Sequence, residues 1–141
     1  MGEMPFEGVP DNIRRRMSGI RKIDTHPEMI VRRMLHRLGF RFRLHRRNLP
    51  GTPDVVFPRL RKIIFVNGCF WHQHDCQLGR PPKSRLEYWL PKLARNTARD
   101  ETCRNQLLKQ GWGVLTIWEC ETKKLDALER KLCHFLASSN L

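Results

Sequence analysis

The chain has 141 residues, with 27 Lys and Arg against 14 Asp and Glu, which gives a formal net charge of +13. This length suits one domain around a single core, and so basic a surface favours a polyphosphate partner such as nucleic acid over a merely solvated face. No apolar run approaches the ~20 residues that span a bilayer, and no signal-peptide core opens the chain. We therefore expect a cytosolic protein without membrane contact, in which the cysteines are not paired as disulfides.

The N-terminal part predicts two helices. Residues 1–10, rich in Gly and Pro, are expected to form a flexible N-terminus before a single domain over 11–141. Asp11 can cap a short basic helix over Asn12–Ile20, with Met17 and Ile20 on one side, in an N-terminal segment that spans 11–22. Thr25–Glu28 has the pattern of a capping box, and Gly39 ends the helix that it opens. Its apolar face comprises Ile30, Val31, Met34, Leu35 and Leu38.

The rest of the chain alternates strands and helices. Strands are predicted over Phe40–His45, Pro53–Phe57, Lys62–Val66 and Trp112–Trp118, the third of them central in a sheet. A long helix follows Ser84 over about Arg85–Gln110 and ends at Gly111. A last helix over Thr122–Leu136 carries Leu125, Leu128, Leu132 and Leu136 on one face. The order α-β-β-β-α-β-α predicts an α/β fold with a mixed sheet flanked by helices.

A compact group of metal-binding residues follows the central strand. Cys69, His72, His74 and Cys76 lie in one short segment, and zinc takes four sulfur or imidazole ligands. So short a loop seldom encloses an ion alone, and Cys120 reaches the same end of the sheet if its strand is the neighbour of Ile63–Val66. The spacing leaves open which histidine binds, whereas Cys103 and Cys133 fit as buried small hydrophobes in helices. The competing interpretation is that all of these are ordinary core residues.

Asp54 is the second point of interest, because it follows Thr-Pro at the start of a strand in a basic protein. Carboxylates hold Mg²⁺, which can activate water and neutralise a leaving oxygen in phosphodiester hydrolysis. An equally simple interpretation is that Asp54 caps the turn through its side chain.

Five segments resemble the very short patch repair (Vsr) DNA mismatch endonucleases, in order and in spacing from about Asn12 to Cys120. They are Leu49–Asp54, Phe65–His72, Glu87–Lys92, Arg95-Asn96 and Val114–Cys120, and the string Gly68–His72 is highly specific. The resemblance implies a restriction-endonuclease-like fold with a structural zinc. It also implies Mg²⁺-dependent nicking 5′ to the thymine of T·G mismatches left by deaminated 5-methylcytosine.

The resemblance further implies site residues. Asp54 becomes the Mg²⁺-binding carboxylate with the Val66 carbonyl as a second ligand, at a site expected to hold two ions. His72 becomes the imidazole beside the scissile phosphate, and Glu28 an acid that supports the metal and its waters, unless the capping box occupies its carboxylate. The implied zinc ligands are Cys69, His74, Cys76 and Cys120.

The chain also departs from the pattern of related nucleases. Where some relatives carry His, it has Asn67, which can hydrogen-bond but cannot exchange protons near neutral pH. Asn67 thus stays in the catalytic group, while acid–base work is expected to fall more heavily on His72.

Aromatic residues are the expected means of mismatch recognition, although core packing is the commoner role of Trp. The resemblance implies a wedge of Phe70, Trp71 and Trp89 against the mismatched pair from the major groove. Met17 and Ile20 would enter from the minor groove, and Lys92 and Asn96 would bond base edges.

The leading hypothesis is a mismatch nickase that acts as a monomer on T·G-containing duplex DNA in the bacterial cytoplasm, associated with the nucleoid, with mismatch-repair proteins as partners. The first alternative is a related restriction-type or structure-specific nuclease without mismatch preference. The second is a zinc-stabilised DNA-binding module in which Asp54 is a turn residue.

Overall fold

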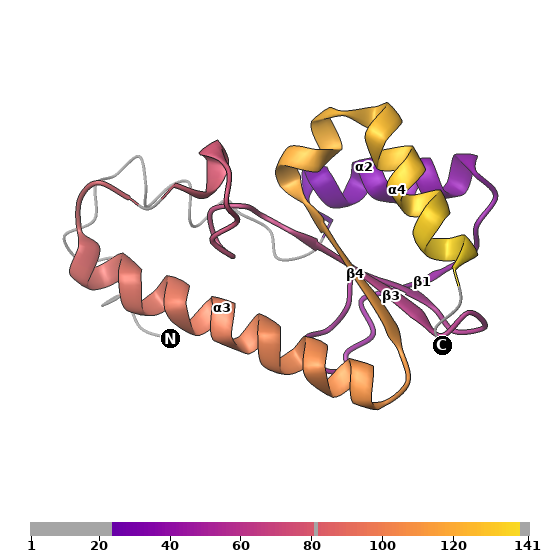
Figure 1. Ribbon diagram of the computed structural model, residues 1–141, viewed down its shortest axis with the longest axis horizontal. Coiled ribbons are helices and arrows are strands. Elements are labelled where there is room, and N and C mark those ends of the chain that lie inside the picture. Colours follow the sequence, from indigo (N-terminus) through magenta and orange to yellow (C-terminus); the bar gives the residue numbers. More distant parts are fainter. Residues whose placement is uncertain (1–23, 81, 139–141) are drawn as a thin grey trace.

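A computed structural model describes residues 24–80 and 82–138 (Figure 1). The expected flexible N-terminus over 1–10 and the helix over Asn12–Ile20, with Met17 and Ile20, lie outside these ranges. Helices and strands follow one another in the predicted order: α2 (His26–Arg37), β1 (Arg43–Leu44), β2 (Val55–Phe57), β3 (Lys62–Asn67), α3 (Leu86–Lys109), β4 (Gly113–Trp118) and α4 (Leu125–Ala137). Short 3₁₀ turns span Gln77–Gly79 and Glu119–Lys123. None of the helices in the described ranges could cross a membrane.

The sheet is mixed, as expected, with β3 in its interior. Its strand order is β1-β2-β3-β4; β2 is antiparallel to β1 and β3, whereas β3 and β4 are parallel. Asn67, the last residue of β3, lies opposite Trp118, the last residue of β4. Because parallel strands end at the same edge, the loop after β3 and the turn after β4 leave the sheet side by side. This register positions the candidate site.

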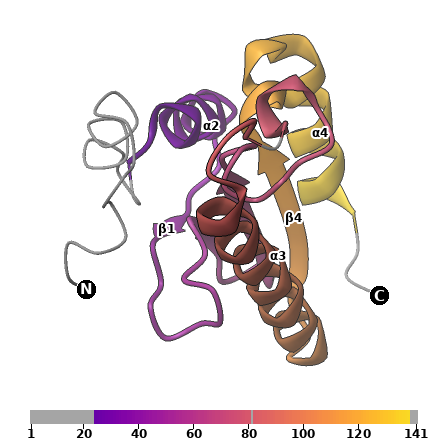
Figure 2. The ribbon, with the colours of Figure 1, turned by 90° about the vertical axis from the view of Figure 1, so that its left-hand side faces the viewer.

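Helices cover both faces of the sheet. In Figure 1, α2 and α4 lie together on one side and α3 on the other, and Figure 2 shows β4 between α4 and α3. The core follows the two-residue period of the strands, since Val55 and Ile64 pack with α2 and α4, whereas Val56 and Ile63 pack with Leu107 of α3. The expected α/β class is therefore confirmed.

The start of α2 matches half of the predicted capping box. The Thr25 hydroxyl accepts a hydrogen bond from the Glu28 backbone N–H at 3.3 Å. The Glu28 carboxylate, however, accepts from the backbone N–H of Asp24 rather than from that of Thr25. Gly39 follows the helix with φ +88°, the left-handed conformation that ends a helix. The Glu28 carboxylate is thus not occupied by a reciprocal cap.

Three predictions about individual elements need correction. The strand expected over Phe40–His45 is only Arg43–Leu44, because the Phe40 N–H still bonds the Leu35 carbonyl of α2 and the chain turns at His45, which has φ +48°. Leu125 is 54% exposed although it falls on the apolar side of the helical pattern, because it is the first residue of α4. Cys133 is exposed, not a buried small hydrophobe, because the buried face of α4 is formed by Leu128, Leu132 and Leu136.

Candidate active site and metal centre

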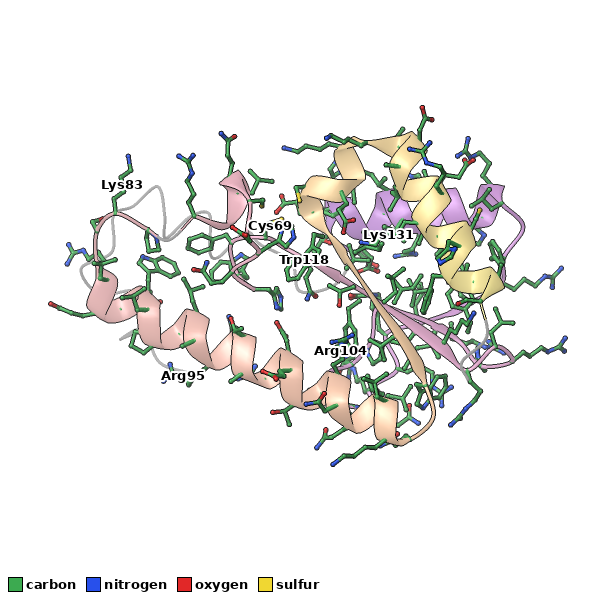
Figure 3. All side chains as sticks on the ribbon, in the orientation of Figure 1. Cys69, Lys83, Arg95, Arg104, Trp118 and Lys131 are labelled. Carbon is green, nitrogen blue, oxygen red and sulfur yellow. The ribbon has the colours of Figure 1, made fainter. Side chains whose placement is uncertain are left out.

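Three cysteines and one histidine converge where β3 and β4 end. The ligand atoms of Cys69, His74, Cys76 and Cys120 all lie within 4.8 Å of one another, and Figure 3 shows Cys69 and Trp118 at this junction. His74 Nδ1 is 3.7 Å from Cys69 Sγ and 3.5 Å from Cys120 Sγ. Cys69 is buried and the other three are half-buried. The parallel register thus brings Cys120 to the loop, as the sequence predicted.

This donor set fits a structural zinc ion. Tetrahedral zinc with ordinary bond lengths separates a sulfur and a nitrogen ligand by about 3.6 Å, close to the two separations given above. Burial raises the pKa of Cys69 to about 12 and also raises that of Cys120. For Cys76, burial has the same effect, but hydrogen bonds from His74, Cys69 and the backbone of Gly79 and Leu78 together outweigh it and lower its pKa to about 7. A dication would favour the thiolate forms of Cys69 and Cys120, which burial disfavours.

The loop that carries these residues is held by its own polar contacts. The Gln73 side chain donates to the Phe70 carbonyl at 2.7 Å and to the Gly79 carbonyl at 3.3 Å. A Cβ atom on Gly79 would lie 1.9 Å from the His74 carbonyl oxygen, so only glycine fits there without a shift of backbone. The Cys120 N–H donates to Cys69 Sγ at 3.4 Å, which ties the turn after β4 to the loop.

The two candidate histidines occupy different sites. His74 stacks on Trp118 with a centroid separation of 4.2 Å and an interplanar angle of 15°. His72 is not part of the sulfur cluster, and its Nδ1 hydrogen-bonds Oδ2 of Asp100 on α3. The structure therefore groups His74 with the cysteines and separates His72 from them. Sequence reasoning missed Asp100, although it recurs at helical spacing with Trp89, Leu93 and Asn96.

Asp54 lies at the start of β2 and bonds across the sheet. Its Oδ2 accepts a hydrogen bond from the Val66 backbone N–H at 2.7 Å, so the carboxylate reaches β3 instead of capping its own turn. Burial, with repulsion from Glu28, raises the pKa of Asp54 to about 7 despite that bond. A positively charged ligand would favour the ionised form. A carboxylate is the kind of oxygen ligand that suits a hard cation such as Mg²⁺.

Glu28 stands beside Asp54 in a polar cluster of its own. Only 1% of Glu28 is exposed, and it accepts hydrogen bonds from the Asp24 N–H at 3.1 Å and Arg32 Nη1 at 3.3 Å. His45 Nε2 lies 2.7 Å from Glu28 Oε2. Sequence reasoning missed Arg32, although it follows Glu28 at the i,i+4 spacing of helical ion pairs, and it missed His45, which carries no local signal of this contact.

The three aromatic residues of the expected wedge are in mutual contact. Phe70 lies 5.3 Å from Trp71 and 5.2 Å from Trp89 between ring centroids, with nearly perpendicular planes, and the two tryptophans lie 5.8 Å apart. Trp89 is buried at 3% exposure, whereas Phe70 and Trp71 are half-buried. Asn96 Nδ2 donates to the Trp71 carbonyl at 3.2 Å, and Lys92 is half-buried one turn earlier on α3. Asn67, at the end of β3, is also half-buried.

Comparison with known proteins identifies relatives over most of the chain. Residues 9–78 match the family described as DNA mismatch endonuclease Vsr. The chain is 50% identical over 130 residues to the type II nicking enzyme V.XorIIP of Xanthomonas oryzae pv. oryzae. The matched region covers 92% of this chain and 96% of that protein. It is 39% identical over 116 residues both to the type II nicking enzyme V.NmeAIP of Neisseria meningitidis (82% and 83% covered) and to the DNA mismatch endonuclease Vsr of Escherichia coli (80% and 74%).

The mixed sheet, the buried Asp54 at the start of β2 and the Cys₃His cluster, together with these relatives, define a DNA-nicking endonuclease. The chain belongs to the Vsr DNA mismatch endonuclease family. An enzyme is therefore confirmed over a non-catalytic DNA-binding module.

Proposed function

We propose that this endonuclease nicks duplex DNA 5′ to the thymine of T·G mismatches, with Asp54 at its catalytic centre. The catalytic assignment depends on the buried Asp54 carboxylate, which accepts a hydrogen bond from the Val66 N–H. Burial and repulsion from Glu28 raise its pKa to about 7. Evolutionary relatives alone would not single out this carboxylate, whereas its environment is the kind that catalytic sites use to bind cations.

Magnesium would be held by the Asp54 carboxylate and the Val66 carbonyl, at a site proposed to take two ions. When bound, Mg²⁺ supplies positive charge to the reacting phosphodiester and promotes ionisation of water. Glu28, beside Asp54, would orient water molecules around the metal site.

His72 is proposed to lie beside the scissile phosphate, where it takes a proton from the attacking water or gives one to the leaving oxygen. Asp100 engages Nδ1 of His72, which fixes the ring orientation and makes Nε2 the atom that takes up or releases the proton. Asn67 lies at the same end of β3 and can hold a phosphate or water by hydrogen bonds, but it cannot replace the imidazole. Acid–base work at the phosphate therefore rests on His72.

Mismatch recognition is assigned to the aromatic cluster of Phe70, Trp71 and Trp89. Phe70 and Trp71 are half-buried on the loop that also bears His72, and edge-to-face contacts of Phe70 with Trp71 and with the buried Trp89 of α3 hold the cluster together. Unstacking a base step costs a few kcal/mol, and a mismatched pair opens more easily than a correct one. Met17 and Ile20 from the basic N-terminal segment, with Lys92 and Asn96 from α3, complete the proposed DNA contacts.

The Cys₃His cluster is proposed to bind zinc as a structural element. Four protein ligands leave no open position for substrate, so the ion would hold the loop between Cys69 and Cys76 against Cys120. This loop carries His72 and two members of the aromatic cluster, Phe70 and Trp71, which pack on Trp89 of α3.

Nicking of fully paired DNA is the second candidate function, favoured by the names of the type II nicking enzymes among the relatives. Strand-resolved cleavage of a T·G duplex beside its fully paired counterpart, with varied flanks and with or without Mg²⁺, separates the two. We expect one nick, on the thymine strand of the mismatched duplex only. Equal cutting of both duplexes would reject mismatch specificity.

The catalytic assignment is tested with Asp54→Ala. We expect loss of nicking with DNA binding retained, while Asp126→Ala, which removes an exposed carboxylate on α4, keeps full activity. Unchanged turnover in Asp54→Ala would remove this residue from the mechanism.

A further inference from the structure

His45 makes the shortest described contact to the buried acid beside Asp54. Its Nε2 lies 2.7 Å from Glu28 Oε2, with the side chain of Glu28 only 1% exposed and that of His45 17% exposed. A hydrogen bond to a carboxylate this deeply buried has no competition from bulk water. The imidazole therefore strongly constrains the direction of the Glu28 carboxylate.

The backbone of His45 is joined to Asp54 as well. The His45 N–H donates to the Asp54 carbonyl at 3.2 Å, just beyond the last residue pair of β1 and β2. His45 has φ +48°, a left-handed conformation that is uncommon for a residue other than glycine. This turn ends β1 and directs the imidazole to Glu28. One residue thus contacts both acids of the proposed catalytic centre, one through its backbone and one through its side chain.

The other partners of Glu28 hold it less directly. Arg32 Nη1 lies 3.3 Å from Glu28 Oε2 but 2.7 Å from Asp24 Oδ1, so its closer contact is with Asp24. The group Asp24, Glu28 and His45 has the donor types of a cation site. The Arg32 guanidinium already supplies positive charge to Asp24 and Glu28. We therefore interpret the group as a set of hydrogen bonds and ion pairs that holds Glu28 in place, and not as a metal site.

We propose that His45 is a positioning residue of the nicking reaction, which holds the Glu28 carboxylate beside Asp54. Two neighbouring buried carboxylates repel each other, and Glu28 would turn towards Arg32 and Asp24 if Oε2 lost its imidazole partner. His45 does not touch the phosphodiester in this proposal. The inference rests on the proposed function, because it assumes that Asp54 and Glu28 form the catalytic centre.

The test is a double-mutant cycle between His45 and Glu28, read as the single-turnover nicking rate of a T·G duplex at saturating protein. His45→Leu should slow nicking about 10- to 100-fold, as loss of a supporting hydrogen bond does at metal sites, with unchanged DNA affinity and zinc content. His45→Gln, which keeps a side-chain donor, should restore the rate to within about threefold of the wild type. His134→Leu is the matched control, since this histidine is exposed on α4.

The decisive quantity is the effect of His45→Leu on the nicking rate with and without the Glu28 carboxylate. In a Glu28→Gln background, His45→Leu should have no further effect, because the carboxylate that it positions is already absent. An equal loss in both backgrounds, no rescue by His45→Gln, or a His45→Leu rate within about threefold of the wild type would overturn the proposal. If His45→Leu does not fold, His45→Asn, too short to reach Glu28, should show the same loss.

Failure of the proposed function gives a different result. Asp54→Ala that still nicks would reject the catalytic centre itself, whatever the cycle shows. Inactive Asp54→Ala together with an additive His45–Glu28 cycle would reject only the role of His45.

Discussion

Asp54→Asn should stabilise the Mg²⁺-free protein at neutral and higher pH while it abolishes nicking. The folded structure raises the pKa of Asp54 from 3.8 to about 7 by burial and repulsion from Glu28. The variant keeps a side-chain oxygen that can accept the Val66 N–H and adds an amide that can donate to Glu28. It therefore removes the buried charge without leaving the backbone donor of Val66 unsatisfied.

The sign follows from proton linkage. Folded protein retains the Asp54 proton up to about pH 7, whereas the unfolded chain loses it near pH 4, so the wild-type free energy of unfolding falls as pH rises through this window. The full shift corresponds to about 4 kcal/mol. Near pH 4 the two proteins should be similarly stable, and by about pH 8 Asp54→Asn should be the more stable by up to that amount.

The assay is urea unfolding of both proteins across this pH range, in Mg²⁺-free buffer with zinc content verified before and after. Because both proteins share all other titrating groups, the contributions of those groups cancel in the difference between the two free energies of unfolding. Added Mg²⁺ should stabilise the wild type at pH 8 and leave the variant unchanged, because only the wild type keeps the carboxylate that binds it. A stability difference that stays constant with pH, or a wild type more stable than Asp54→Asn at pH 8, would refute the reasoning.

Further predictions concern the zinc loop and DNA binding. Gly79→Ala should lower stability by about 1–3 kcal/mol and reduce zinc content, since its Cβ would collide with the His74 carbonyl; unchanged zinc and unfolding midpoint would contradict the close approach. Cys69→Ser should release zinc and destabilise the fold, and native protein without zinc by metal analysis would refute the centre. Trp71→Ala should reduce the preference for T·G over paired duplex more than general DNA affinity, and a proportional loss of both would count against recognition. If about six phosphates are neutralised, affinity should fall about 10³-fold from 50 to 200 mM salt in titrations, whereas a flat salt response would argue against phosphate contacts.

Local signals in the sequence were sufficient for much of the fold. Thr25 and Gly39 mark the start and end of α2, and the apolar run of Lys62–Val66 marks the interior strand, because caps, breakers and periodicity act between residues a few positions apart. The same signals failed for Leu125 and Cys133. A helical pattern gives the direction of a side chain but does not say which neighbouring element covers it.

The Cys₃His cluster was also predicted only in part. Cys69 and Cys76 are close along the chain, so their grouping with a histidine was readable from spacing. Spacing left the choice between His72 and His74 open. The fold groups His74 with the cysteines and pairs His72 with Asp100, which is 28 residues away in sequence.

The amino-acid sequence by itself determined the order of elements, the metal-binding residue types and the acidic residue at the start of β2. Only the tertiary structure decided which of these side chains meet. The parallel register of β3 and β4 brings Cys120 to the loop after β3, and the turn at His45 directs its imidazole to Glu28. Such contacts depend on strand register and on burial, which raises the pKa of Asp54, and neither is encoded in any short segment of the chain.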